Sequence, residues 1–153
     1  MASAIRDVAA SRADLNSNLN FGPIDDLLIC DAEAELGAKF PPDFRNYLLE
    51  FAGGLLLGWE LYGIQSERSV YPPELDIPGN QILDIVEQNR LMQNPAGVLE
   101  FTNDGGGFFF AFIPDRDPNA VFVRGYGADW AKLYPSFHDF LGHIADDSIG
   151  YPA

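Results

Sequence analysis

The spacing of apolar residues predicts two short helices in succession near the start of the chain. The first is expected over residues 23–36, because Pro23 suits a first helical turn and Gly37 can adopt the left-handed backbone that ends many helices. The second is expected over residues 41–51, where apolar side chains recur at the spacing of one helix face and Gly53–Gly54 follow. Residues 23–54 therefore predict two helices joined at a defined angle.

Further along the chain, the apolar positions change to the pattern of β-strands. Strands are predicted where apolar residues run together, over 55–64, 98–102, 108–113 and 120–124. Residues 108–113 contain no polar side chain, so we expect this strand to be buried on both faces. Helical spacing returns over 82–94 and 135–144, and the Pro-containing residues 65–80 are expected to form a long loop.

Length and composition indicate a single folded domain. The chain has 153 residues, of which 47% are hydrophobic, enough to build a core. Its 12 Phe and 6 Tyr favour a compact α+β domain over a helical bundle. We assign residues 21–147 to this domain, residues 1–20 to an N-terminal helix or tail, and residues 148–153 to a C-terminal tail.

The balance of charges restricts the choice of partners. The chain carries 23 acidic and 9 basic side chains, a formal net charge of −14. Binding to nucleic acid or to an anionic membrane surface depends on basic side chains, so the sequence predicts neither partner. A basic protein would instead be attracted by this field. The alternative is that the acidity serves only to keep a small domain soluble.

The single cysteine and the N-terminus add further expectations. Cys30 has no second cysteine to pair with, so an intramolecular disulfide and a cysteine-based metal cluster are excluded. We expect its thiol to be a small core side chain. The N-terminal residues carry charges too early for a signal peptide, and the apolar runs are too short to cross a bilayer. We therefore expect a cytoplasmic location, and we expect no cofactor.

Three segments resemble ligand sites, and each has a simpler interpretation. Gly105–Gly107 precede an apolar strand instead of the helix that a phosphate loop needs, so they predict a hairpin turn. Asp115–Asn119 begin like a calcium loop, but Ala120 stands where that loop needs Gly. His138 and His143 are five residues apart, whereas a zinc pair on one helix face is four apart. No metal site is therefore assigned.

The charged residues inside apolar segments also have a structural explanation. Glu100 lies within a predicted strand, and we expect Arg124 on a neighbouring strand to pair with it. Asp43 and Arg45 are expected on the exposed side of their helix. The chain lacks a Gly-x-Ser-x-Gly nucleophile motif, and we predict that it is not an enzyme. Catalysis by a pair of carboxylates is a less favoured alternative.

A set of short motifs follows in a fixed order over residues 24–145. The motifs are Glu33, Glu35-Leu36-Gly37, Phe40-Pro41, Phe44, Tyr47-Leu48-Leu49, Gly53-Gly54, Leu61-Tyr62-Gly63, residues 99–107 and residues 136–141. This ordered set resembles the SUKH superfamily, also called the Smi/Knr-like family. Each motif alone is weak, and their order carries the resemblance. Phe40 replaces a smaller aliphatic residue of the family pattern, and Ala52 stands where an Asn is often found.

The resemblance implies an α+β fold with helices packed around a largely antiparallel β-sheet. It also implies a binding role, because many bacterial members resemble immunity proteins that neutralise a toxin, often a nuclease. We therefore expect an immunity protein, monomeric or weakly dimeric, that blocks a basic toxin domain by stoichiometric occlusion. Fungal relatives act as cell-wall regulators and interaction hubs, so a regulatory protein-interaction module without a toxin partner is the alternative.

Candidate partner contacts are acidic and aromatic side chains on predicted loops and strand ends. The carboxylates would face Arg and Lys of the toxin, and an aromatic side chain would supply a buried anchor. No catalytic or metal-binding residue is assigned. The candidates are Glu60, Tyr62, Glu67, Tyr71, Glu74, Asp76, Asp104, Asp115, Asp117 and Asp129.

Overall fold

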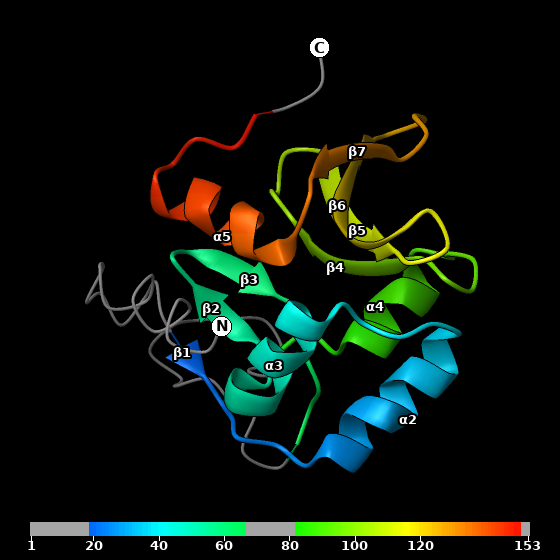
Figure 1. Ribbon diagram of the computed structural model, residues 1–153, viewed down its shortest axis with the longest axis vertical. Helices are drawn as coiled ribbons and strands as arrows, with labels where there is room; N and C mark the ends of the chain where they lie inside the picture. The colour runs from blue at the N-terminus through cyan, green and yellow to red at the C-terminus, as the bar shows by residue number, and fades with distance from the viewer. Residues whose placement is uncertain (1–18, 67–81, 151–153) are drawn as a thin grey trace.

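The computed structural model describes residues 19–66 and 82–150 (Figure 1). In this part of the chain, four helices pack around a three-stranded sheet of order β1-β2-β3 and a four-stranded sheet of order β4-β5-β6-β7. Neighbouring strands are antiparallel throughout both sheets, which confirms the predicted α+β class. The elements are β1 (Leu19–Asn20), α2 (Asp26–Leu36), α3 (Pro42–Phe51), β2 (Gly54–Leu56), β3 (Trp59–Leu61), α4 (Ile85–Leu91), β4 (Leu99–Asn103), β5 (Phe108–Ile113), β6 (Asp117–Gly125), β7 (Ala131–Tyr134) and α5 (Phe137–Ala145).

The two helices predicted at the start of the domain are present, and α2 begins later than expected. The side chain of Asp25 caps α2 by accepting the backbone N–H of Leu27 at 2.9 Å, so the helix begins at Asp26. Gly37 ends it with a φ of 78°, as predicted. The residue that ends α3 is Ala52, with a φ of 63°. This left-handed conformation costs a residue with a Cβ about 1 kcal/mol.

The apolar run 55–64 was predicted as one strand, and it forms a hairpin instead. Leu56 pairs with Trp59 across a two-residue turn, so β2 and β3 lie side by side. Both turn residues have positive φ, 52° at Leu57 and 83° at Gly58, which is the tight turn that matches the twist of a hairpin. Residues 19–20, predicted to end an N-terminal helix or tail, form β1 and pair with β2.

The β2-β3 hairpin is joined to the four-stranded sheet through β4. The backbone N–H of Tyr62 donates to the carbonyl of Phe101 at 2.8 Å. The hydroxyl of Thr102 donates to the carbonyl of Glu60, also at 2.8 Å. The three-stranded and four-stranded sheets therefore meet along β3 and β4, and the ends of their hairpins lie close together.

The main core is formed by one face of the four-stranded sheet, by the β2-β3 hairpin and by the inner faces of the four helices. Phe44 of α3 is fully buried at its centre. The core side of β5 is formed by Phe110 and Phe112, and the strand is buried on both faces over most of its length, as predicted. The rings whose centroids lie within 5.6 Å of that of Phe44 are Phe40, Tyr47, Phe101, Phe112 and Phe137.

The opposite face of the same sheet carries a second, smaller apolar cluster, covered by Trp130. The guanidinium of Arg124 lies 4.9 Å from the centre of the Trp130 ring, and that of Arg116 lies 5.9 Å from the centre of the Phe122 ring. Arg116 also donates to the backbone carbonyl of Trp130 at 3.0 Å. The cluster consists of Val98, Ala111, Ile113, Ala120 and Phe122.

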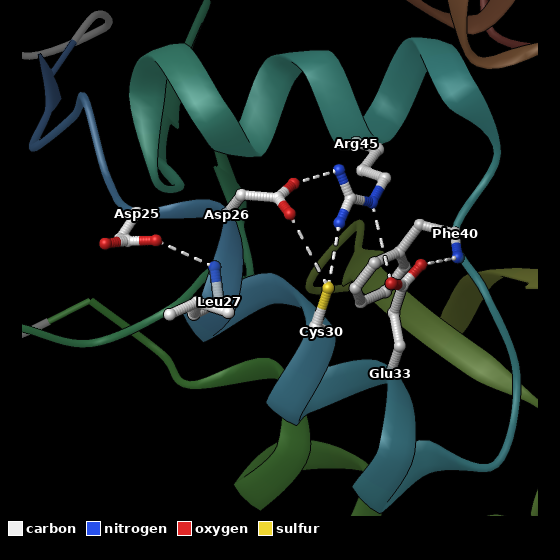
Figure 2. A network of polar contacts seen from close by, with 7 residues as sticks. All are labelled: Asp25, Asp26, Leu27, Cys30, Glu33, Phe40 and Arg45. Atoms are coloured by element: carbon white, nitrogen blue, oxygen red, sulfur yellow. Dashed lines mark hydrogen bonds and ion pairs between the residues drawn. The ribbon is translucent and has the colours of Figure 1, made fainter.

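Cys30 is exposed on α2, so its prediction as a core residue is wrong (Figure 2). Its Sγ lies 3.3 Å from Nη2 of Arg45, which places the thiol in a polar contact between α2 and α3. Arg45 also forms ion pairs with Asp26 and, at 3.5 Å, with Glu33. The hydrogen bond from Arg45 holds the pKa of Asp26 below its ordinary value.

Two further features differ from the sequence prediction. Asp43 was expected to be exposed, but it is buried, and its Oδ2 accepts the backbone N–H of His138 at 3.1 Å. This contact fixes the start of α5 against α3. The strand β7 was not predicted, because residues 131–134 are short and mostly solvent-facing. None of the helices in the described residues is long and apolar enough to cross a membrane.

Candidate functional site

A pocket of about 490 Å³ lies where the β2-β3 turn meets the β4-β5 turn. Its position follows from the junction of the two sheets, because β3 and β4 lie side by side and both turns extend beyond that contact. Its volume falls within the range of small-ligand pockets. The lining residues are Leu57, Gly58, Trp59, Glu60, Asn103, Asp104 and Gly105.

The pocket contains two carboxylates that have no cationic partner among the described residues. Oε1 of Glu60 is buried and has no hydrogen-bond partner in that part of the chain. Burial raises the pKa of Glu60 above its ordinary value. Oδ1 of Asp104 accepts the backbone N–H groups of Gly106, at 2.8 Å, and Phe108, at 3.0 Å, so this side chain is held by its own turn.

Behind the pocket lies a buried polar network centred on Tyr62. Its hydroxyl donates to Oε2 of Glu100 at 3.1 Å and accepts from the side-chain amide of Asn103 at 2.7 Å. Asn94 donates to Oε1 of Glu100 at 3.4 Å. Asn103 therefore connects the pocket wall to this network, which fixes the side chain of Asn103 from behind.

Glu100 is fully buried at the centre of this network, and its hydrogen-bond partners do not include Arg124, the partner predicted from the sequence. The side chain of Asn89 bonds the backbone of Glu100 twice, accepting its N–H at 2.9 Å and donating to its carbonyl at 2.9 Å. Arg124 stands on β6, two strands away, and makes no ion pair with Glu100. Burial raises the pKa of Glu100, while hydrogen bonds from Asn94 and Tyr62 and the positive charge of Arg124 act in the opposite direction. The predicted attraction between Arg124 and Glu100 is therefore present, although the two side chains form no direct ion pair.

The structure brings together part of the predicted contact set. Glu60 and Asp104 line the pocket, and Tyr62 lies behind it. Tyr62 is only 2% exposed, so its ring is not available as the surface anchor that the sequence suggested. Four other candidates lie outside the described residues: Glu67, Tyr71, Glu74 and Asp76.

The remaining candidates do not line the pocket. Asp115 and Asp117 lie at the β5-β6 turn, at the opposite end of β5 from Asp104. Asp117 is ion-paired with Lys132 at 2.9 Å, and its pKa is lowered, first by the backbone N–H of Asn119. Asp129 is exposed in the loop before β7.

Sequence reasoning missed two residues that shape the pocket. Trp59 was treated only as a bulky member of a predicted strand, and it forms a wall of the pocket while its ring contacts Phe110 and Phe140 of the core. Asn103 was treated as part of a turn. Gly58, between two apolar segments, was the available signal for the hairpin that places Trp59 here.

The chemistry of this arrangement favours binding a cation. The pocket is lined by the carboxylates of Glu60 and Asp104, whereas the amide of Asn103 is already engaged by the hydroxyl of Tyr62 and the backbone N–H of Gly105. Glu100 is sealed behind the pocket with both side-chain oxygens hydrogen-bonded. The described residues contain no group of three or more His, Cys, Asp and Glu that could hold a metal ion.

The fold and the pocket thus define a compact α+β domain with an acidic recess at the meeting point of two hairpins. The family model SUKH_6, described as SMI1-KNR4 cell-wall, matches residues 26–141 of this chain. The chain therefore belongs to this SUKH family, which confirms the resemblance seen in the ordered motifs. None of the curated proteins matches the chain.

Proposed function

We propose that this chain is an immunity protein that binds a basic toxin domain and blocks it by stoichiometric occlusion, without catalysing a reaction. The observation that carries the proposal is the net charge of −14 on a member of the SUKH family. An acidic protein of this kind attracts a basic partner and occupies the Arg and Lys side chains that would otherwise hold nucleic acid.

The arrangement of basic side chains supports this proposal. Within the described residues, Arg45, Arg90 and Lys132 are ion-paired to acids of the same chain. Arg116 and Arg124 lie over aromatic rings of the second apolar cluster. The ion pairs within the described residues engage the carboxylates of Asp26, Glu33, Glu35 and Asp117, whereas exposed acids such as Asp115 and Asp129 form no ion pair with a described residue.

The first experiment is affinity capture from the native host with the tagged full-length chain, at low and at moderate salt. We expect one basic protein at equal stoichiometry, released as the salt concentration rises. The purified pair should then associate with a rate that falls steeply with salt. Several unrelated partners, or none across growth conditions, would favour a regulatory interaction module instead.

A matched set of substitutions tests the electrostatic part. Asp115→Lys with Asp129→Lys reverses two exposed candidate contacts, whereas Asp115→Glu with Asp129→Glu keeps their charge. We expect the first pair to slow association with the captured protein and the second pair to leave it unchanged. Equal association rates for all three proteins would refute electrostatic steering by these residues.

A further inference from the structure

We propose that Arg124 and the aromatic rings around it bind a carboxylate of the partner protein, and that this contact fixes the orientation of the partner. This inference rests on the proposed function and deepens it. The site lies on the face of the four-stranded sheet opposite the main core, where Arg124 of β6 lies beside Trp130. Arginine, tryptophan and tyrosine are the residues in which interface energy most often concentrates.

The guanidinium of Arg124 is held in position by two aromatic rings. It lies 4.9 Å from the centre of the Trp130 ring and 6.0 Å from the centre of the Phe109 ring, and Phe109 is its pairing partner across β5 and β6. Its Nε is closed off from solvent without an acceptor, whereas its two Nη groups are not closed off. A partner can therefore reach the Nη edge of a side chain that is already ordered.

The Nη groups of Arg124 have no acid to pair with among the described residues. Glu100 attracts Arg124 through space, but its two carboxylate oxygens accept from Tyr62 and Asn94. The exposed Asp129 forms no ion pair with it either. A guanidinium without a paired acid is unexpected in a chain with 23 acidic and 9 basic side chains. Its donors are therefore available to a partner.

An exposed aromatic side chain borders the site. Tyr126 is 82% exposed, and its ring meets that of Phe109 edge to face, with 5.2 Å between the ring centres. The ring also packs against Gly107, where an added Cβ would lie 3.7 Å from it. A tyrosine supported on one side and open on the other offers a rigid contact surface at low entropic cost. The site thus combines a fixed guanidinium edge with an aromatic surface.

A carboxylate is the acceptor that matches this edge, because a guanidinium binds it through two parallel hydrogen bonds. The contact reverses the overall charges of the proposed complex, since here the acidic chain supplies the cation and the basic partner supplies the anion. In other orientations, Arg124 would face Arg and Lys side chains of the partner, which repel it. The long-range field therefore attracts the partner, and this contact specifies the bound orientation.

The test measures the association and dissociation rates of the full-length chain with the basic protein captured from the host. Arg124→Gln makes the chain more acidic, so electrostatic steering alone predicts binding at least as tight as that of the unsubstituted chain. We expect the opposite result, a Kd about tenfold higher through faster dissociation, because a charge-assisted contact is lost. Arg124→Lys keeps the charge without the planar pair of donors and should restore only part of the affinity.

The matched control is Arg90→Gln, which removes the same charge from an exposed side chain on α4 and should not raise the Kd. Tyr126→Ala should speed dissociation, because the aromatic surface is removed. In a double-mutant cycle, one Asp or Glu of the captured protein should couple to Arg124 by about fivefold or more. Thermal unfolding of each variant separates a lost contact, which leaves the midpoint unchanged, from a loss of structure.

The outcomes separate this site from the proposed function. A captured basic protein that binds Arg124→Gln as tightly as the unsubstituted chain would keep the immunity proposal and overturn the carboxylate site. Equal rises in Kd for Arg124→Gln and Arg90→Gln, or a partner without an acid that couples to Arg124, would also overturn the site. If the unsubstituted chain captures no basic protein, the proposed function fails, and this site fails with it.

Discussion

The buried carboxylate of Glu33 should stabilise the fold far more than its exposed neighbour Glu35 on the same helix. Glu33 accepts the backbone N–H of Phe40 at 2.8 Å and pairs with Arg45 at 3.5 Å, with only 9% of its side chain exposed (Figure 2). Glu35 pairs with Arg90 at 2.6 Å, and 58% of its side chain is exposed. Both residues thus have an arginine partner, and they differ in burial and in the backbone bond.

The expected magnitude follows from these contacts. Glu33→Ala leaves the buried N–H of Phe40 without an acceptor, which costs about 1–3 kcal/mol, and removes a partly buried ion pair worth up to about 1 kcal/mol. We expect a loss of about 2–3 kcal/mol in the free energy of unfolding. Glu35→Ala should cost no more than about 0.5 kcal/mol, because an exposed pair contributes little.

The assay is urea unfolding followed by circular dichroism, with both variants compared with the unsubstituted chain under one condition. Effects of helix propensity and helix dipole are nearly the same at the two positions, so Glu35→Ala is a matched control. Glu33→Gln keeps an acceptor for Phe40 and should recover more than half of the loss. If Glu33→Ala and Glu35→Ala cost the same, the burial argument is refuted.

Two other predictions concern the buried network and the glycines. Burial raises the pKa of Glu100 above its ordinary 4.5, so the contribution of this side chain to stability is complete below about pH 4.5 and is lost as the pH rises through the raised pKa. Relative to Glu100→Gln, the unsubstituted chain should therefore lose stability as the pH rises above about 4.5. Parallel pH profiles of the two proteins in urea unfolding would contradict this. Gly63→Ala should lower the free energy of unfolding by at least about 3 kcal/mol, because the new Cβ would lie 1.9 Å from the carbonyl oxygen of Ala52. Gly142→Ala in α5 meets no atom within 4 Å and should raise the free energy of unfolding by about 0.5–1 kcal/mol. Thermal unfolding that ranks the two variants in the opposite order would refute the packing argument.

The elements with a strong periodic pattern could be predicted from the sequence. The amphipathic face of α3, the stop at Gly37 and the uniformly apolar β5 each have one dominant local cause, and the structure confirms them. Their side chains point to the core for reasons that lie within a few residues, so no long-range information was needed.

The features that escaped prediction depend on contacts between distant segments. Leu57 takes a left-handed conformation that its sequence does not suggest, and the hairpin it creates is stabilised by pairing with residues far along the chain. Cys30 and Asp43 were misplaced because their surroundings are set by Arg45 and the start of α5. The pocket itself joins two turns some 45 positions apart, so neither segment alone indicates it.

The hydrogen bonds that join β3 to β4 also bear on the rigidity of the recess between the two turns. The backbone N–H of Tyr62 donates to the carbonyl of Phe101, and the hydroxyl of Thr102 donates to the carbonyl of Glu60, so both walls of the recess stand on one continuous scaffold. A partner that fits such a preorganised recess would need no conformational change before binding. If the proposed partner contacts this recess, we therefore expect affinity differences among partner variants to appear in their dissociation rates.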